Sequence, residues 1–293
     1  MTVAAPSPTD GSSFGEIDLA GLTAKADTEN FPVALRVLPS RMRAQLTAVY
    51  RYARFVDDLG DRYVGDRVAA LDRAEVELDR AFAGHSAHPV FVDIVETVRA
   101  IGVDRQPLDD LIAANRLDQR KIRYGSIEEL EMYCSLSANP VGRLVLGIFG
   151  TTDGRSIEWS DRICTGLQLV EHLQDIGEDA RDGRVYFPVP DLDRFGVAVA
   201  DLQGTATSPG LRRLVAFESA RARSMLLDGL PLVARMTGVR RLALAGFVGG
   251  GIAQLDEIAK RQFDVLGRLV KAPSRTVLSR AVAIAIRPQR GRR

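Results

Sequence analysis

The sequence predicts an all-α fold, a helical bundle that forms a single domain. Apolar residues recur at steps of three and four from Asn30 to about Leu266, and no run of alternating β-branched residues indicates a strand. No shift in composition and no Ser- or Gly-rich linker divides this region. With 293 residues, 46% of them apolar, the chain is long enough to bury a large core. We expect a disordered tail over 1–25, the all-α domain over 26–284 and a basic tail over 285–293.

The first predicted helix follows Pro39 and Ser40, which are suitable start signals. Its apolar stripe consists of Leu46, Val49, Tyr50, Ala53 and Val56. Further helices are expected at about 66–84, 89–102, 106–120, 126–150, 156–182, 209–236 and 238–264. Loops are expected at AGHSAHP, TTDGRS and DGRVYFPVPDLDRFGV.

The predicted helix over 130–150 contains Pro140, which should kink it because proline clashes with the carbonyl group of Leu136. Ser137, Ala138 and Gly142 around the kink are small. They permit close packing against another helix, or they leave room along a cavity wall. Both interpretations can hold together.

Composition excludes several classes of function. A net charge of +1 gives no reason to expect a nucleic-acid partner. Three scattered histidines are too few for a zinc site, and Cys134 and Cys164 are expected to be buried thiols in a reducing cytosol. No stretch approaches 18 apolar residues, and the N-terminus does not resemble a signal peptide, so we expect a cytoplasmic protein. The C-terminal RPQRGRR is either solvated or weakly attracted to anionic lipid headgroups.

Two clusters of acidic residues suggest chemistry. VDDLGD (56–61) and QDIGED (174–179) each place two aspartates four residues apart, on one face of a helix: Asp57 and Asp61, then Asp175 and Asp179. Glu171 extends the second face by one more turn. Like charges at this spacing destabilise an isolated helix by about 0.2–0.5 kcal/mol per pair. One such pair is commonly a solvated face, but two pairs beside apolar stripes favour a cation site.

Carboxylates on facing helices suit Mg²⁺, which bridges protein carboxylates to substrate phosphate oxygens. The pattern therefore predicts a diphosphate site between two acidic walls. Arg54 precedes Asp57 by one turn and is the best candidate for a basic partner; Tyr50 and Gln168 extend the two polar lines. No P-loop occurs, and GFVGGG (246–251) follows a helical pattern without the spacing of a dinucleotide-binding turn.

These motifs resemble those of the head-to-head prenyl synthases, which make squalene, dehydrosqualene and phytoene. The resemblance covers about 28–266 and rests on four motifs in order: YRYARFVDDLGD (50–61), DQRKIRY (118–124), YCSLSANPVG (133–142) and LQLVEHLQDIGEDARDGRVYFP (167–188). ENFPV (29–33) and SANPVGR (137–143) are similar to bacterial hydroxysqualene synthases of hopanoid biosynthesis. The resemblance to this family implies an isoprenoid-synthase-type helical bundle around a central cavity.

The resemblance also implies roles for individual residues. Asp57, Asp61, Asp175 and Asp179 would bind Mg²⁺ and the diphosphate, with Glu171 as a further ligand. Arg54, Tyr50, Lys121 and Arg123 would contact the phosphate side. A hydrocarbon cavity with Gln168 near its polar mouth would be lined by Phe31, Tyr133, Ser137, Ala138, Val141 and Gly142.

Two positions depart from the family's pattern. Asn30-Phe31 replaces a Ser-Phe pair, which removes a hydroxyl that could hold a diphosphate. Glu171, followed by His172, stands where relatives usually carry Asn, and makes the second wall more anionic. One hypothesis is that Glu171 or His172 positions or deprotonates a water molecule. The alternative is that Glu171 adds a ligand and His172 packs outward.

Three functions remain open at this point. The first is Mg²⁺-dependent conversion of presqualene diphosphate to hydroxysqualene, with water capturing the carbocation. The second is condensation of two prenyl diphosphates to presqualene or prephytoene diphosphate, and the third is a non-catalytic helical binding protein. A greasy product suggests peripheral contact with the inner face of the membrane and handover to other hopanoid-pathway enzymes.

Overall fold

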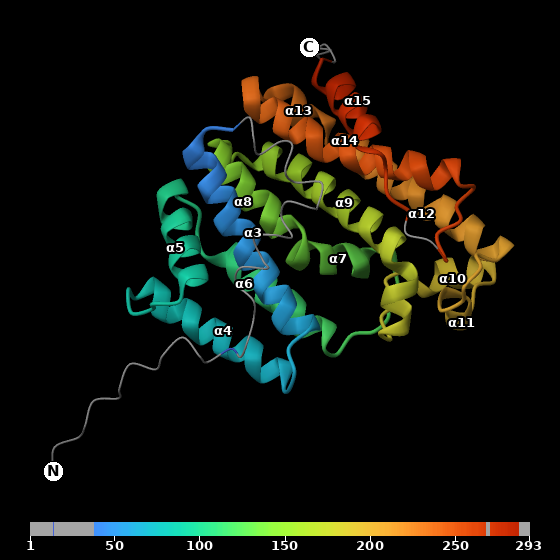
Figure 1. Ribbon diagram of the computed structural model, residues 1–293, viewed down its shortest axis with the longest axis horizontal. Coiled ribbons are helices and arrows are strands. Elements are labelled where there is room, and N and C mark those ends of the chain that lie inside the picture. Colours follow the sequence, from blue (N-terminus) through green and yellow to red (C-terminus); the bar gives the residue numbers. More distant parts are fainter. Residues whose placement is uncertain (1–13, 15–37, 268–269, 287–293) are drawn as a thin grey trace.

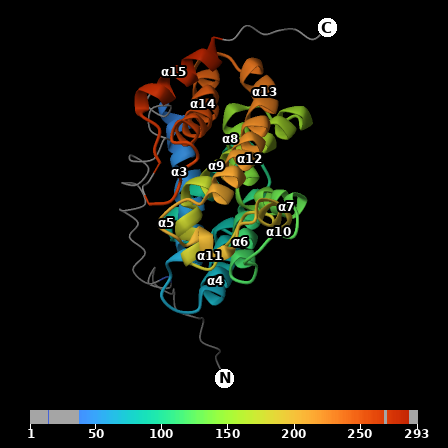
Figure 2. The same ribbon diagram turned by 90° about the vertical axis from the view of Figure 1, so that its right-hand side faces the viewer.

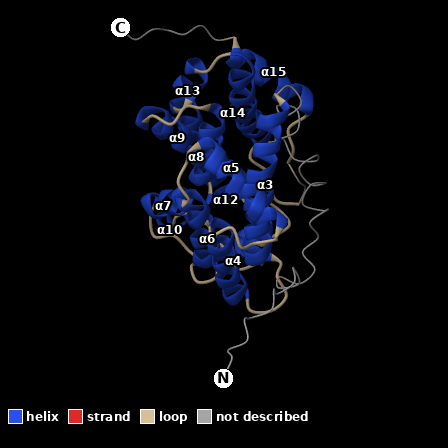
Figure 3. Cartoon of the chain, turned by 90° about the vertical axis from the view of Figure 1, so that its left-hand side faces the viewer, coloured by secondary structure: helices blue, strands red, loops and turns tan. Residues whose placement is uncertain are grey.

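Helices account for all regular secondary structure in residues 38–267 and 270–286, which together with residue 14 are the part of the chain that the computed structural model describes (Figures 1 and 3). The all-α prediction is confirmed. The helices are α3 (Ser40–Asp61), α4 (Arg67–Phe82), α5 (Pro89–Ile101), α6 (Gln106–Asp118), α7 (Ile127–Ser137), α8 (Asn139–Phe149), α9 (Gly154–Arg181), α10 (Val189–Phe195), α11 (Val199–Leu202), α12 (Pro209–Asp228), α13 (Leu230–Arg235), α14 (Gly238–Lys260) and α15 (Ser274–Ala285).

Two expected long helices are each divided in the structure. The helix predicted over 126–150 is not kinked but broken, with Ala138 between α7 and α8 and Pro140 in the first turn of α8. Proline is well tolerated there because the amide groups of a first turn have no partner within the helix. The helix predicted over 209–236 is divided in the same way at Gly229.

Three helices were not predicted. α10 and α11 lie in and after the segment that we expected to be a loop, and α15 lies beyond the last expected helix. Pro190 lies in the first turn of α10, a position where proline is tolerated. Short helices of this kind depend on tertiary packing, which a periodicity search over longer windows does not detect.

The long helices α3, α8 and α9 run side by side through the middle of the molecule (Figures 1 and 2). α9 packs against α8 on one side and against α12 on another, while α4, α5 and α6 lie at one end and α13, α14 and α15 at the other. The largest fully buried side chains include Tyr52, Phe55, Phe91 and Phe149, and the Phe91 ring of α5 packs edge-to-face against Tyr52 and Phe55 of α3. This packing fixes the relative positions of α3 and α9, which carry the two acidic motifs.

Gly142 shows why α8 and α9 can approach each other closely. A Cβ atom at this position would lie 2.5 Å from the Cys164 Sγ atom and 2.6 Å from the Ser160 Oγ atom, both on α9. A larger residue at this position would require the Cys164 and Ser160 side chains, or the helices themselves, to shift. The small residues near the break therefore do permit close packing, as one of the two interpretations held.

α14 has the length and the apolar composition of a membrane-spanning helix, but 67% of its most apolar window is buried inside the structure. That degree of burial is what a core helix of a large bundle shows. The GFVGGG segment lies inside α14 and forms no turn before a helix. Cys134 and Cys164 are both free thiols; Cys134 is buried, as expected, whereas Cys164 is half-buried.

Candidate active site

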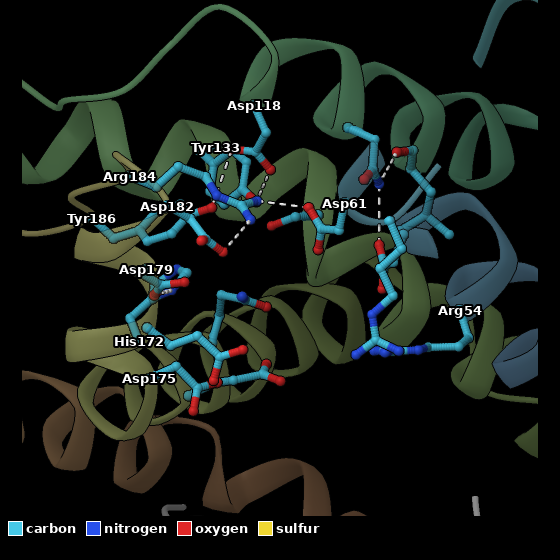
Figure 4. A pocket seen from close by; sticks show the side chains of 18 residues that line it. Arg54, Asp61, Asp118, Tyr133, His172, Asp175, Asp179, Asp182, Arg184 and Tyr186 are labelled. Atoms are coloured by element: carbon cyan, nitrogen blue, oxygen red, sulfur yellow. Dashed lines mark hydrogen bonds and ion pairs between the residues drawn. The ribbon is translucent and has the colours of Figure 1, made fainter. Parts of the chain in front are cut away.

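A cavity of about 340 Å³ lies between α3, α6, α7 and α9, and polar side chains dominate its wall (Figure 4). The lining residues are Arg54, Asp57, Asp61, Arg62, Leu111, Asn115, Asp118, Tyr133, Ser137, Gln168, Glu171, His172, Asp175, Glu178, Asp179, Asp182, Arg184 and Tyr186. We call this space the acidic cavity. It unites both aspartate motifs, which are more than a hundred residues apart in the sequence.

The two aspartate pairs form two walls of the acidic cavity. Asp57 and Asp61 occupy the last turns of α3, and Asp175 and Asp179 occupy the last turns of α9. The C-terminus of a helix carries partial negative charge, so carboxylates there are in an unfavourable field. Four aspartates placed in this way gain from a bound cation, and the folded chain holds them in position for one.

Burial and mutual repulsion raise the pKa values of the aspartates in the acidic cavity. Burial, and then the charge of Asp175, raises the pKa of Asp179 to about 8. Burial also raises the pKa of Asp57 to about 6, with a further contribution from the charge of Asp61. The pKa of Asp175 is raised for the same two reasons, burial first and then the charge of Glu178. Without a metal ion the site is therefore frustrated, and a divalent cation would relieve it.

Asn115 of α6 holds Asp57 in place. Its Nδ2 atom donates a hydrogen bond to the Asp57 Oδ1 atom at 3.1 Å and another to the Leu111 carbonyl oxygen at 3.1 Å. This position depends on Gly60 of the first motif, where a Cβ atom would lie 2.3 Å from the Asn115 Oδ1 atom. The glycine of VDDLGD thus provides the room in which the asparagine reaches the aspartate.

Arg184 connects the two walls, although it belongs to neither acidic helix. It follows α9, and its guanidinium group lies 2.7 Å from an Asp61 carboxylate oxygen of α3 and 3.9 Å from an Asp182 oxygen (Figure 4). Its charge also opposes the rise in the pKa of Asp179. The sequence analysis missed this residue, although it lies within the quoted second motif.

A cluster of tyrosine rings and one carboxylate lies beside Arg184 (Figure 4). The Tyr133 hydroxyl donates a hydrogen bond to an Asp118 oxygen at 2.6 Å, and the Tyr186 hydroxyl donates to the other oxygen at 3.3 Å. Burial raises the pKa of Asp118 to about 6, against the opposing effect of the Tyr133 bond. Asp118 and Tyr186 also lie in quoted motifs, but no spacing rule singled them out.

His172 is buried at the cavity wall, so the alternative in which it packs outward is wrong. Its ring stacks on Tyr186 with centroids 3.8 Å apart and an interplanar angle of 11°. Its Nδ1 atom lies 3.9 Å from an Asp179 oxygen. Burial, and then the nearby Arg184 charge, lowers the pKa of His172 to about 3, which keeps the imidazole neutral. It turns inward because Tyr186, from the chain after α9, covers this turn of the helix.

A second cavity, of about 110 Å³ and almost wholly apolar, lies between α8, α9, α13 and α14. It is lined by Val141, Gly142, Val145, Leu146, Ser160, Ile163, Cys164, Leu167, Leu232, Leu244 and Phe247. We call it the apolar cavity. Cys164 of α9 lines the apolar cavity, and Gln168, one turn later on the same helix, lines the acidic cavity, so the two cavities follow each other along α9. On the facing side, Val141 belongs to α8 and Ser137 is the last residue of α7.

The structure brings most of the predicted site residues to these two cavities. Nine line the acidic cavity: Arg54, Asp57, Asp61, Tyr133, Ser137, Gln168, Glu171, Asp175 and Asp179. Val141 and Gly142 line the apolar one. Tyr133 and Ser137, which were expected on the hydrocarbon wall, line the acidic cavity instead because both belong to α7, before the break at Ala138. Arg54 forms an ion pair with Asp58 at 3.3 Å at the edge of the cavity.

The remaining predicted residues lie elsewhere. Tyr50 is half-buried on α3 one turn before Arg54, and Ala138 separates α7 from α8; neither lines a cavity described above. Lys121 forms an ion pair with Glu129 and lies over the Tyr124 ring, and Arg123 is exposed. The turn after α6 directs both basic side chains away from the acidic cavity. Phe31 lies outside the described residues.

The donor set fits Mg²⁺ in one particular way. Aspartate and glutamate oxygens are the hard ligands that this ion prefers. Within residues 38–267 and 270–286, no three His, Cys, Asp or Glu side chains are close enough together to hold an ion by themselves. The acidic cavity therefore suits ions that take one or two carboxylates from each wall and complete their coordination with substrate phosphate oxygens and water.

Comparison with known proteins agrees with this geometry. The model of the squalene/phytoene synthase family matches residues 24–280. The chain is 36% identical to a hydroxysqualene synthase of Rhodopseudomonas palustris, over 72% of this chain and 73% of that one, and 31% identical to a phytoene synthase of Arthrospira platensis, over 84% of each. The crystal structure of squalene synthase HpnC from Alicyclobacillus acidocaldarius superposes with a TM-score of 0.76 at 39% identity, covering 84% of this chain and 94% of that one. The chain therefore belongs to the squalene/phytoene synthase family.

Proposed function

We propose that this protein converts presqualene diphosphate to hydroxysqualene in a Mg²⁺-dependent reaction. The diphosphate group leaves, the carbocation rearranges, and water adds to it with release of one proton. The observation that carries the proposal is that the acidic cavity and the apolar cavity lie in succession along α9. A substrate with a diphosphate head and long hydrocarbon chains matches that order.

The acidic cavity supplies the groups that a departing diphosphate requires. Asp57 and Asp61 from one wall, with Asp175 and Asp179 from the other, would hold Mg²⁺, and the bound ions neutralise charge on the leaving group. Arg54, at the edge of the cavity, adds a positive charge to the same region. Because these groups are held by packed helices, little reorganisation is needed when the substrate binds.

The apolar cavity supplies the opposite environment. A carbocation survives only where water and nucleophilic side chains are kept away. The surface of this cavity is almost entirely aliphatic and aromatic carbon. Its one serine, Ser160, and its one cysteine, Cys164, lie against Gly142. Burial raises the pKa of Cys164 to about 12, so its thiol stays neutral and is a poor nucleophile.

The formation of an alcohol requires one water molecule to be admitted and deprotonated. Glu171 lines the acidic cavity one turn before Asp175 on α9 and is exposed, and its charge contributes to the raised pKa of Asp179. We infer that Glu171 positions this water and accepts its proton. His172 remains neutral beside it, and its stacking on Tyr186 keeps this part of the wall rigid.

A second candidate function is condensation of two prenyl diphosphates. The similarity to a phytoene synthase, over a longer part of the chain than the similarity to the hydroxysqualene synthase, favours it. The acidic cavity contains the same features that ionisation of a first prenyl diphosphate would use. The two functions differ in substrate, and substrate consumption separates them.

The test is to incubate the purified protein with Mg²⁺ and either presqualene diphosphate or farnesyl diphosphate, without NADPH, and to identify the products. Hydroxysqualene from presqualene diphosphate, with farnesyl diphosphate left intact, is the expected result. Consumption of farnesyl diphosphate alone would replace the proposal with the condensation. If neither substrate reacts, and Asp57→Ala and Asp175→Ala bind diphosphate as the wild type does, the protein is a non-catalytic member of the family.

The role of Glu171 has its own test. Glu171→Gln should release diphosphate from presqualene diphosphate but yield less hydroxysqualene, with elimination or rearranged hydrocarbon products instead. The matched control is Glu158→Gln, an exposed glutamate on the same helix outside both cavities. Unchanged hydroxysqualene output and unchanged Mg²⁺ dependence in Glu171→Gln would remove Glu171 from the reaction.

A further inference from the structure

The outward side of α15 carries a stripe of exposed apolar side chains. Leu278, Val282 and Ile286 follow at steps of four residues and are 56%, 46% and 74% exposed. Arg275 is exposed on the same side, one turn before Leu278 and two turns before Val282. We call these four residues the α15 outer face. Single exposed apolar residues need no explanation, but three in one stripe on a terminal helix form a surface that could bind a partner.

The rest of α15 is held firmly, so this face cannot rotate into the core. The backbone of Ala281 packs so closely on Gly249 of α14 that a Cβ atom there would lie 2.6 Å from the Ala281 nitrogen. Ile284 is buried, and Arg280 forms an ion pair with Asp256 of α14 at 2.6 Å. The inner side of α15 is thus used by the bundle, and the orientation of its outer face follows from that packing.

The charge of this end of the chain indicates the kind of partner. Residues 270–293 contain seven of the chain's 39 basic residues and none of its 38 acidic residues. The remaining residues carry 32 basic and 38 acidic side chains, a net negative charge. Basic residues beside an apolar helical stripe match a bilayer with anionic headgroups, which repels the rest of the molecule.

The position of α15 relative to the apolar cavity supports the same partner. α14 packs against α15, and Leu244 and Phe247 of α14 line the apolar cavity on another side of the helix. In Figures 1 and 2, α13, α14 and α15 gather at the end of the molecule opposite α4. One helix therefore separates the outer face from the space that suits a hydrocarbon chain.

We propose that the α15 outer face docks on the surface of an anionic lipid bilayer. Leu278, Val282 and Ile286 enter the boundary between headgroups and acyl chains, and Arg275 contacts lipid phosphates. The contact is interfacial and adds no membrane-spanning segment. It holds the end of the molecule that contains the apolar cavity next to the phase in which long hydrocarbons dissolve.

The test measures sedimentation of the full-length protein with lipid vesicles. Wild-type protein should bind vesicles that contain phosphatidylglycerol, and bind pure phosphatidylcholine vesicles at least about tenfold more weakly. Leu278→Asp/Val282→Asp should weaken binding to the anionic vesicles at least about tenfold. The control is Val76→Asp on α4, which is 58% exposed at the opposite end and should bind as the wild type does. Thermal melting establishes that all three proteins are folded.

A second variant keeps the proposal testable if the double substitution disturbs folding. Ile286→Trp adds a reporter at the outer face, and its fluorescence should shift to the blue with anionic vesicles only. Three results would overturn the proposal: no vesicle binding by wild type, equal binding by the double variant, or no fluorescence shift. If the wild type is a dimer that the double variant dissociates, and vesicles do not bind, a second copy of the chain covers this face instead.

Discussion

Asp179 lies at the C-terminal end of α9, where burial, the negative end of the helix and the charge of Asp175 all oppose its ionisation. The substitution Asp179→Asn keeps the size of the side chain and removes the charge. It should therefore have two opposite effects. Without metal the variant should be more stable than the wild type, whereas Mg²⁺-dependent turnover should be lost.

The magnitude follows from the acid strength. Folding raises the pKa of Asp179 from an ordinary 3.8 to about 8. Because the folded pKa is the higher one, the folded state holds more protons than the unfolded state between these values, and stability falls as the pH rises through that range. Integrated to pH 7.5, the shift amounts to a penalty of at most about 5 kcal/mol. Relaxation of the neighbouring groups and entry of water reduce this figure, and we expect about 2 kcal/mol.

The assay is thermal melting in EDTA at several pH values. At pH 7.5 the melting temperature of Asp179→Asn should exceed that of the wild type by about 4–8 °C, and the difference should shrink to about 1–2 °C at pH 4. Asp193→Asn, an exposed aspartate of α10, serves as the control and should not differ from the wild type. A variant that melts below the wild type, or a difference that does not depend on pH, would refute the reasoning that burial and the charge of Asp175 oppose the ionisation of Asp179.

Three further results are expected. Mg²⁺ with inorganic diphosphate should raise the wild-type melting temperature, by an amount equivalent to about 2.7 kcal/mol at a hundredfold excess over Kd, and either component alone should do less; equal effects from each alone would contradict a shared site. Gly60→Ala should lower the free energy of unfolding by about 1–3 kcal/mol, because the new Cβ displaces Asn115. In denaturant titrations the same substitution should cost much less in an Asn115→Ala background, and fully additive losses in the double variant would exclude that contact. Arg184→Gln should leave Asp61 without its partner and weaken diphosphate binding at least about tenfold by calorimetry, whereas Arg181→Gln, an exposed neighbour, should not.

Much of the site could be predicted because it is local along the chain. Two aspartates four residues apart share a helix face wherever the helix lies, so Asp57 with Asp61 and Asp175 with Asp179 could be paired from spacing alone. That both pairs would face one cavity followed from chemistry, since carboxylates beside apolar stripes need a common counter-charge. Helical periodicity likewise identified the long helices, whose apolar stripes repeat over many turns.

Other features depended on side chains that meet only after folding. Arg184 and Tyr186 come from the segment after α9, and Asn115 comes from α6. No spacing along the chain relates Arg184 to Asp61, Asn115 to Asp57 or Tyr186 to Asp118. His172 could not be oriented from its own helix, because the ring that covers it, Tyr186, arrives from the following turn.

The sequence by itself therefore determined an all-α chain with two pairs of carboxylates, each on one face of its helix, since periodicity and i, i+4 spacing are properties of a single helix. Only the tertiary structure decided which basic and aromatic groups complete the acidic cavity, and that the helix before Gly142 breaks at Ala138. It also decided which side of α15 remains exposed. These outcomes depend on close packing between segments distant in the chain, where the size of a single side chain limits how closely two helices approach each other.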